Sequence, residues 1–203
     1  MGMIEPEKYS PQQRRQLMDL ETSIRTEIAA PRGGRIVTMG FPGLAFGIDG
    51  GAYLDPARMA ATLDHPVLSR CGLLAVLVEP GEMPGGALAA LETACTARGT
   101  GFAHLPIEDY SVPGPGFRAG WAQIESRVAR ILEDGGTLGL SCHYGAGRSG
   151  LIAAGLLIDQ GLSAEAALEV LRGQFPDSVE SAAQLDWLAA RARDRAAAAL
   201  RPA

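Results

Sequence analysis

Residues 136–160 read GTLGLSCHYGAGRSGLIAAGLLIDQ, and they are the most informative stretch of the chain. Its first six residues form a short apolar run typical of a buried strand, and the apolar segment from residue 149 onward is typical of a helix. The loop between them carries glycines, with Cys142 at its start and Arg148 at its end. A loop that leads from a strand into a helix N-terminus presents backbone N–H groups and a partial positive charge to an anion. The stretch therefore predicts a phosphate-binding loop that contains a cysteine.

Several residues of this loop suit a nucleophile as well as a phosphate. Gly145 and Gly147 permit the positive φ angles that such a cradle requires, and the planar guanidinium of Arg148 can bind two phosphate oxygens at once. A helix N-terminus and a neighbouring guanidinium both favour the thiolate of Cys142, which is the nucleophilic form of a cysteine. The same loop is therefore expected to hold the phosphate and to activate the attacking group.

The run from Cys142 to Ser149 resembles the Cys-x5-Arg-Ser signature loop of the cysteine-dependent protein tyrosine and dual-specificity phosphatases. A second motif agrees with it, because residues 106–113 read PIEDYSVP and are similar to the Pro-Ile-x-Asp-x-x-x-Pro acid loop of the compact dual-specificity branch. A general acid beside a phenolate or alkoxide leaving group contributes about 10²–10⁴-fold to the rate. The resemblance implies a protein tyrosine phosphatase-like domain that hydrolyses phosphomonoesters.

The resemblance also implies a role for each matching residue. Cys142 would form a phosphocysteine intermediate, and Arg148 would clamp the phosphoryl oxygens. Asp109 would act first as acid and then as base, and the Ser149 hydroxyl would help the thiolate to depart. No metal or cofactor is implied, because backbone amides and an arginine supply the charge stabilisation. The phosphate-binding residues would be Arg148 and the loop residues His143, Tyr144, Gly145, Ala146 and Gly147.

Three positions leave alternatives open. The family usually has a histidine directly before the cysteine, where this chain has Ser141; this favours weaker activity or activity at higher pH, and it leaves open a phosphate-binding pseudophosphatase. Glu108 is a rival proton donor if the acid loop is registered one residue differently. Gln184 resembles a glutamine that can lie near the site in some compact relatives, and its alternative is an ordinary surface position.

Two other classes of protein also place glycines or cysteines in such loops. Residues 145–150 spell Gly-x-Gly-x-x-Gly, the dinucleotide-binding fingerprint, but that fold requires a second strand after the helix. Residues 162–171 instead predict another helix, with Ser163 as its N-cap. Rhodanese-like sulfur transferases carry a persulfide on a cysteine in an anion-binding loop. They need no acid at Asp109. The cysteine loop is therefore compatible with sulfur transfer as well as with phosphate hydrolysis, and this alternative stays open.

Composition favours an ordinary cytoplasmic enzyme. The chain has 203 residues, 47% of them hydrophobic and 20% charged, which is enough for one substantial core. A net charge of −5 disfavours nucleic acid or an anionic membrane as a partner. No stretch approaches the roughly 20 apolar residues of a membrane span. The three cysteines fit a reducing compartment, with Cys71 and Cys95 expected to be buried and inert; whether either can pair with Cys142 under oxidation stays open.

Strand and helix patterns alternate along the chain, which predicts an α/β fold with a mostly parallel central sheet flanked by helices. We expect an N-terminal extension over residues 1–32 that contains an extra helix, and a single phosphatase-like domain over residues 33–203. Besides the catalytic strand and helix, the expected strands are 35–40, 73–78 and 101–107, and the expected helices are 11–29, 59–63, 88–97, 120–132, 166–171 and 181–199. Residues 41–51 are expected to form a long connection.

The loop composition also bears on the substrate. Phosphatases of this type that act on polyphosphorylated inositols or their lipids tend to carry lysines within the signature loop, and residues 143–147 contain none. A strongly anionic substrate would find little extra positive charge there. We therefore expect a phosphorylated protein as the partner, with phosphotyrosine ahead of phosphoserine and phosphothreonine.

Overall fold

A five-stranded sheet forms the centre of the computed structural model, which describes residues 22–199. The spatial order of its strands is β1-β2-β7-β5-β6. The edge strand β1 runs antiparallel to β2, and all other neighbouring pairs are parallel. The carboxyl ends of four strands therefore meet at one edge of the sheet, which is where open α/β sheets bind ligands. The bounds are β1 (Ile24–Ala29), β2 (Arg35–Met39), β5 (Cys71–Val76), β6 (Gly101–His104) and β7 (Thr137–Ser141).

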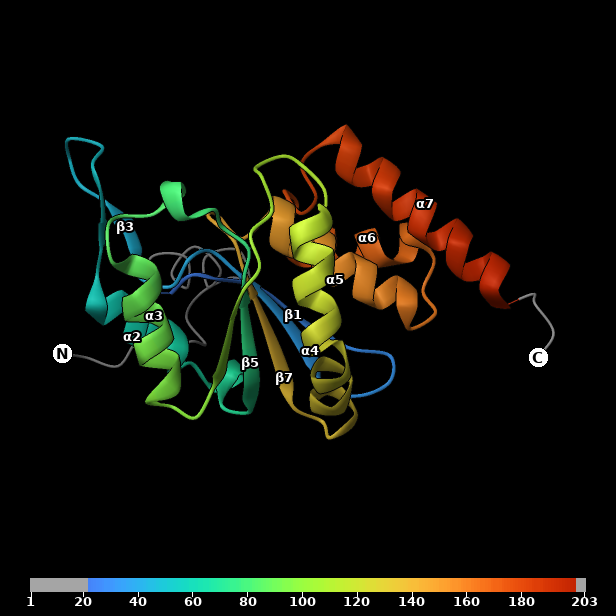
Figure 1. Cartoon of the computed structure of the whole chain (residues 1–203), viewed down its shortest axis with the longest axis horizontal. Helices are drawn as coiled ribbons and strands as arrows, with labels where there is room; N and C mark the ends of the chain where they lie inside the picture. The colour runs from blue at the N-terminus through green and yellow to red at the C-terminus, as the bar shows by residue number, and fades with distance from the viewer. Residues whose placement is uncertain (1–21, 200–203) are drawn as a thin grey trace, which may run out of the picture.

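Helices cover both faces of this sheet (Figure 1). On one face lie α2 (Pro56–Leu63) and α3 (Ala87–Thr96). On the other face lie α4 (Pro115–Glu133), α5 (Gly147–Asp159) and α6 (Ala164–Gln174). The last helix, α7 (Ala182–Ala199), packs on α5 and α6. The connections include two short 3-10 helices, η2 (Pro66–Leu68) and η3 (Pro80–Glu82), and a hairpin of β3 (Leu44–Phe46) and β4 (Ala52–Leu54).

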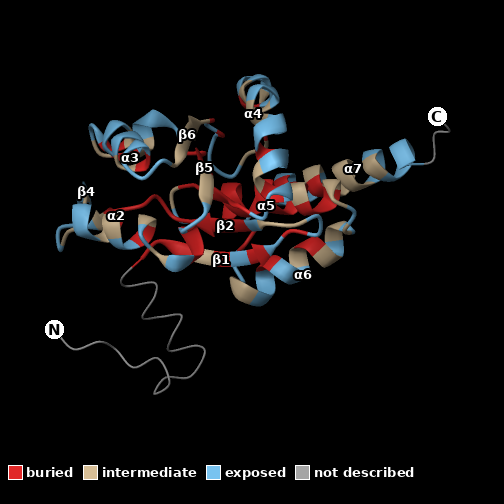
Figure 2. Ribbon diagram, turned by 90° about the horizontal axis from the view of Figure 1, so that it is seen from below, coloured by how far each residue is buried: buried red, intermediate tan, exposed pale blue. Residues whose placement is uncertain are grey.

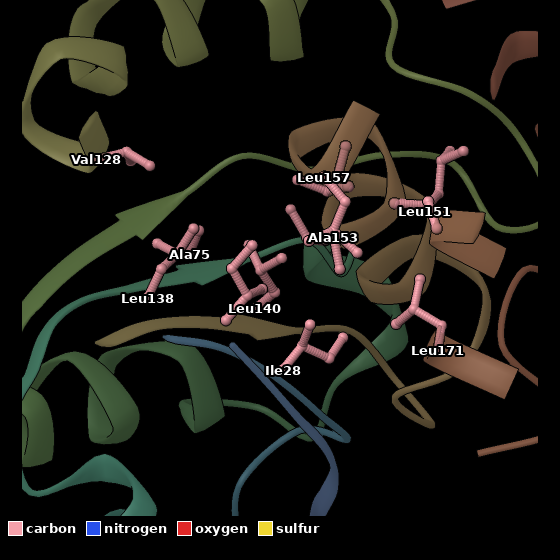
Figure 3. Packing of buried hydrophobic residues seen from close by; sticks show 14 of the residues in the cluster. Ile28, Ala75, Val128, Leu138, Leu140, Leu151, Ala153, Leu157 and Leu171 are labelled. Atoms are coloured by element: carbon pink, nitrogen blue, oxygen red, sulfur yellow. The ribbon is translucent and has the colours of Figure 1, made fainter. Parts of the chain in front are cut away.

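Each face of the sheet has its own hydrophobic core. Because side chains alternate along a strand, Leu138 and Leu140 of β7 face α5, while Leu74 and Val76 of β5 face the side of α2 and α3. Figure 3 shows the first of these cores, in which sheet residues meet Leu151, Ala153 and Leu157 of α5. Burial is concentrated in the sheet and in α5, which is buried over most of its length (Figure 2). The prediction of a sheet covered on both faces is confirmed.

One predicted element is wrong. The helix expected over residues 11–29 is a strand over Ile24–Ala29, and residues 11–21 lie outside the described part of the chain. The physical reason is a two-residue alternation in which Ile24, Thr26 and Ile28 point into the molecule while their neighbours are more exposed. A boundary at residue 32 would separate β1 from the β2 strand to which it hydrogen-bonds.

The other expected elements occur, with ends that differ by a few residues. Ser163 caps α6 through a hydrogen bond from the N–H of Ala166, and no strand lies between α5 and residue 199, so the dinucleotide-binding alternative lacks its second strand there. Residues 41–51 are more ordered than expected, because they contain β3 and run into β4. Over residues 22–199, no helix combines the length and the apolar character that crossing a bilayer requires.

Candidate active site

The cysteine loop joins the end of β7 to the start of α5, as the sequence predicts. The N–H of Gly145 donates to Sγ of Cys142 at 3.2 Å, and Oγ of Ser149 lies 3.3 Å from the same sulfur. Gly145 has a φ of +95°, and a side chain there would collide with the backbone at Gly40. The loop thus directs one backbone N–H at Sγ and places the Ser149 hydroxyl within hydrogen-bond distance of it, where either of the two atoms can be the donor.

The loop is also supported from the edge of the sheet. The N–H of Phe41, just after β2, donates to the carbonyl oxygen of His143 at 3.2 Å. Arg25 of β1 donates from Nε to the carbonyl oxygen of Tyr144 at 3.0 Å, and its guanidinium lies 5.0 Å from the centre of the Tyr144 ring. The residues mistaken for a helix in the sequence therefore help to shape the cysteine loop.

Arg148 is the buried cation of the site, with a side chain only 2% exposed. Its two terminal nitrogens donate to the two carboxylate oxygens of Glu82, at 2.5 and 2.6 Å, and one of them also donates to the carbonyl oxygen of Ile107 at 3.1 Å. Burial acts to raise the pKa of the Glu82 carboxyl, but the hydrogen bonds and charge of Arg148 outweigh it and hold that pKa below its ordinary value. Glu82 thus fixes the guanidinium as a bidentate ion pair.

The acid loop brings Asp109 to the same place. The chain runs from β6 along β5, where the N–H of Ile107 donates to the carbonyl oxygen of Leu77 at 3.0 Å. Oδ1 of Asp109 then lies 3.2 Å from a terminal nitrogen of Arg148, and the Asp109 side chain remains 54% exposed. Glu108 is exposed and does not line the pocket. The acid-loop register with Asp109 facing the cysteine loop is the one that the structure adopts.

These groups enclose a pocket of about 320 Å³. Its lining residues are Asp109, Tyr110, Cys142, His143, Tyr144, Arg148 and Glu180. The remaining predicted site residues, Gly145, Ala146, Gly147 and Ser149, are buried in the loop and do not line the pocket. Cysteine, arginine and aspartate from two distant sequence motifs therefore face one cavity of a size that suits a phosphorylated side chain. Over residues 22–199, no group of three histidine, cysteine or carboxylate side chains gathers as a metal site.

Of two further residues near the pocket, Glu180 was not singled out from the sequence, whereas Gln184 was expected either near the site or at the surface. Glu180 lines the pocket and accepts a hydrogen bond from the N–H of Gly147. Gln184 is fully buried, so a surface position for it is wrong; its Nε2 donates to the carbonyl oxygen of Ser111 in the acid loop at 3.2 Å.

The sequence and the structure were compared with those of known proteins. No protein-family model and no curated protein matches the sequence, but solved structures do. Kinase-associated phosphatase, in a form whose catalytic-site cysteine is replaced by serine, is 23% identical with a TM-score of 0.60, over 80% of this chain and 88% of that one. Tk-PTP in its active form is 26% identical with a TM-score of 0.58, over 84% of this chain and 97% of that one. A glycine-to-alanine mutant form of Tk-PTP is 30% identical with a TM-score of 0.53, over 76% and 97%. The chain belongs to the cysteine-dependent protein tyrosine phosphatase superfamily.

The fold is that of the compact, dual-specificity-like phosphatases in this superfamily. A further relative in fold, PTPMT1 solved in complex with PI(5)P, is 15% identical with a TM-score of 0.59, over 85% of this chain and 98% of that one. Where phosphatases of this superfamily usually carry a histidine before the cysteine, Ser141 is fully buried, and its hydroxyl donates to the carbonyl oxygen of Gly40 at 3.3 Å.

The other two cysteines of this phosphatase-family chain lie away from the site. All three thiols are free. Burial raises the pKa of Cys71, and burial raises that of Cys95 to about 12. Cys71 stands opposite Thr137, five positions before Cys142 on β7, which corresponds to about 16 Å along the strand. A disulfide needs Cα atoms within about 7 Å, so Cys71 cannot protect Cys142 in this fold.

Proposed function

We propose that this protein is a phosphomonoester hydrolase of the protein tyrosine or dual-specificity type that works through a phosphocysteine intermediate. The observation that carries the proposal is that Cys142, Arg148 and Asp109 line the same pocket. A nucleophile, a phosphate clamp and a proton donor are the three groups that metal-free phosphoryl transfer to a cysteine requires. The phosphatases to which the chain is similar support the same class of reaction.

The geometry supports the following first step. Sγ of Cys142 attacks the phosphorus while Arg148 and the N–H groups of the loop bind the phosphoryl oxygens. The P–O bond to the leaving group breaks, and Asp109 donates its proton to that oxygen. In the second step water cleaves the P–S bond, and the Ser149 hydroxyl, 3.3 Å from Sγ, stabilises the departing thiolate.

The rim of the pocket bears on the substrate class. Tyr110 and Tyr144 line it and are 60% and 50% exposed, so their rings can contact a flat aromatic group. The loop carries no lysine to bind further phosphates, in contrast to what a polyphosphorylated headgroup would require. We therefore assign a phosphorylated protein as substrate, with phosphotyrosine preferred over phosphoserine and phosphothreonine.

The test is hydrolysis of para-nitrophenyl phosphate between about pH 5 and 8, with chelator present, by the wild type and by Cys142→Ser. We expect chelator-resistant turnover in the wild type and none in the variant, because a hydroxyl at this position is not ionised. Cys142→Ser should still bind vanadate or phosphate, since Arg148 and the loop amides remain. Full activity in the variant would overturn the mechanism.

A further inference from the structure

A short segment between α6 and α7, residues 178–181, is fixed against the cysteine loop. Arg172 of α6 donates from Nε and from a terminal nitrogen to the carbonyl oxygens of Ser178 and Val179, at 3.0 Å each. The N–H of Val179 donates to the carbonyl oxygen of Ala146 at 3.3 Å. The segment is therefore tied both to its own helix and to the phosphate-binding loop.

The backbone of this segment is strained at Val179. Its φ is +64°, a conformation that β-branched residues rarely adopt, and the side chain is only 3% exposed. Such strain persists only where the surroundings impose it, and it gathers at functional sites. The residue that this unusual turn presents to the pocket is the next one, Glu180.

The other side of the segment is tied to the acid loop. Oε1 of Gln184 accepts the N–H of Glu180 at 2.9 Å, and its Nε2 donates to the acid loop at Ser111. The Ser181 hydroxyl donates to the carbonyl oxygen of Tyr110 at 2.7 Å. Glu180 and Asp109 are therefore held in one framework on the same pocket.

The two carboxyl groups differ in their partners. Asp109 pairs with Arg148 at 3.2 Å, and its Oδ1 also accepts the N–H of Tyr110 at 3.1 Å. Glu180 accepts a neutral N–H from Gly147, and a methyl group on Gly147 would overlap its carboxylate. Partial burial, with the charges of Asp109 and Asp177, raises the pKa of Glu180; the Gly147 N–H and Arg148 oppose this but do not cancel it. A raised pKa makes a carboxylate a stronger base.

We propose that Glu180 is the general base for hydrolysis of the phosphocysteine intermediate, while Asp109 serves the leaving group. This inference rests on the proposed phosphatase function, and it moves the second role that the family resemblance gives to Asp109. As the oxygen of water bonds to phosphorus, Glu180 takes one of its protons. The P–S bond breaks, its electron pair returns to Sγ of Cys142 as a thiolate, and phosphate departs. Glu180 then releases the proton to solvent, from which Asp109 regains its own.

The test separates the two half-reactions by rapid acid quench of the full-length protein with para-nitrophenyl phosphate. Glu180→Gln keeps the size and polarity of the side chain but cannot accept a proton. We expect phosphocysteine to form at the wild-type rate and to decay about 10²-fold more slowly, so that it accumulates. The decay rate in the wild type should fall as pH drops through the pKa of Glu180, and the variant should lose this dependence. Glu169→Gln, the same change on an exposed position of α6, is the matched control and should behave as wild type.

Several results of this experiment would contradict the proposal. Wild-type decay in Glu180→Gln, or an equal slowing of both half-reactions, would overturn the role of Glu180. If Glu180→Gln loses its fold by circular dichroism, Glu180→Asp replaces it, because it keeps a carboxyl group but withdraws it from the pocket. Decay at the wild-type rate and pH dependence in Glu180→Asp would likewise overturn the inference. Turnover that persists in Cys142→Ser would instead contradict the proposed function.

Discussion

At the scale of single residues, the charges of the site converge on Arg148. A buried guanidinium without partners would be costly, and here two nitrogens are paired with Glu82 while Asp109 lies 3.2 Å from one of them. These pairs set the plane of the guanidinium before any substrate arrives. A lysine could not make the same two parallel hydrogen bonds, because it presents a single point charge.

Asp109 and Glu108 are neighbours in the chain, and only Asp109 is expected to act as the proton donor. We expect Asp109→Asn to slow hydrolysis of aryl phosphates by about 10²–10⁴-fold, since an amide cannot donate the proton that the leaving oxygen needs. Glu108→Gln should leave the rate unchanged, because Glu108 is exposed outside the pocket. Steady-state kinetics of both variants with phenolic leaving groups of different basicity would measure this.

The reverse result, with Glu108→Gln impaired and Asp109→Asn active, would mean that the acid loop adopts another register during catalysis. Sulfur transfer from thiosulfate, measured on the same Asp109→Asn protein, tests the rhodanese-like alternative. That reaction needs no acid at this position, so a sulfur transferase would keep its activity.

At the scale of elements, the cysteine loop was predictable and its supports were not. Residues 136–160 carry strand, glycine loop and helix in one continuous pattern, and the structure has β7 and α5 there. Glu82 is 66 residues away from Arg148 in the chain and belongs to a 3-10 turn without a motif. The position of Glu180 at the pocket depends on a positive φ at Val179, and a valine in the sequence does not predict such a backbone angle.

The first strand was missed for a different reason. Ile24, Thr26 and Ile28 alternate inward as a strand requires, but the polar residues before them extend a pattern that a long helix would also explain. Pairing with β2 decides between the two, because it satisfies the backbone of an edge strand and buries Ile28. Tertiary contacts of this kind override local propensity.

Two glycines with positive φ angles, one inside the cysteine loop and one outside it, should differ in their effect on anion binding. Gly145→Ala and Gly161→Ala both place a side chain at a positive φ, +95° and +113°, so both should destabilise the fold by about 1–3 kcal/mol. A methyl group at Gly161 meets nothing within 4 Å, whereas one at Gly145 collides with the backbone at Gly40. Only Gly145→Ala should therefore lose binding of vanadate.

Urea unfolding and calorimetric titration with vanadate would measure the two effects. Equal vanadate affinity in the two variants would show that the loop tolerates the methyl group and that the close approach of Gly145 to Gly40 is not needed for anion binding.

At the scale of the whole molecule, one sheet supports two cores and the active site. Leu140 belongs to the core on the α5 side and Leu74 to the core on the α2 and α3 side, and both are essentially unexposed. Leu140→Ala and Leu74→Ala should each lower the free energy of unfolding by about 2–5 kcal/mol. Because the cores share the strands between them, each variant should still unfold in one transition.

Urea unfolding followed by both fluorescence and circular dichroism would check this expectation. Two separate transitions in either variant would contradict the single domain, since one core would then unfold without the other.

The proposed mechanism requires Cys142 to carry the phosphoryl group during turnover. The most direct measurement is mass spectrometry of protein quenched in acid during hydrolysis of para-nitrophenyl phosphate, followed by peptide mapping. We expect at most one phosphate per chain, attached to the peptide that contains Cys142, and none in Cys142→Ser. Phosphate on another residue, or turnover that persists in Cys142→Ser, would contradict this mechanism.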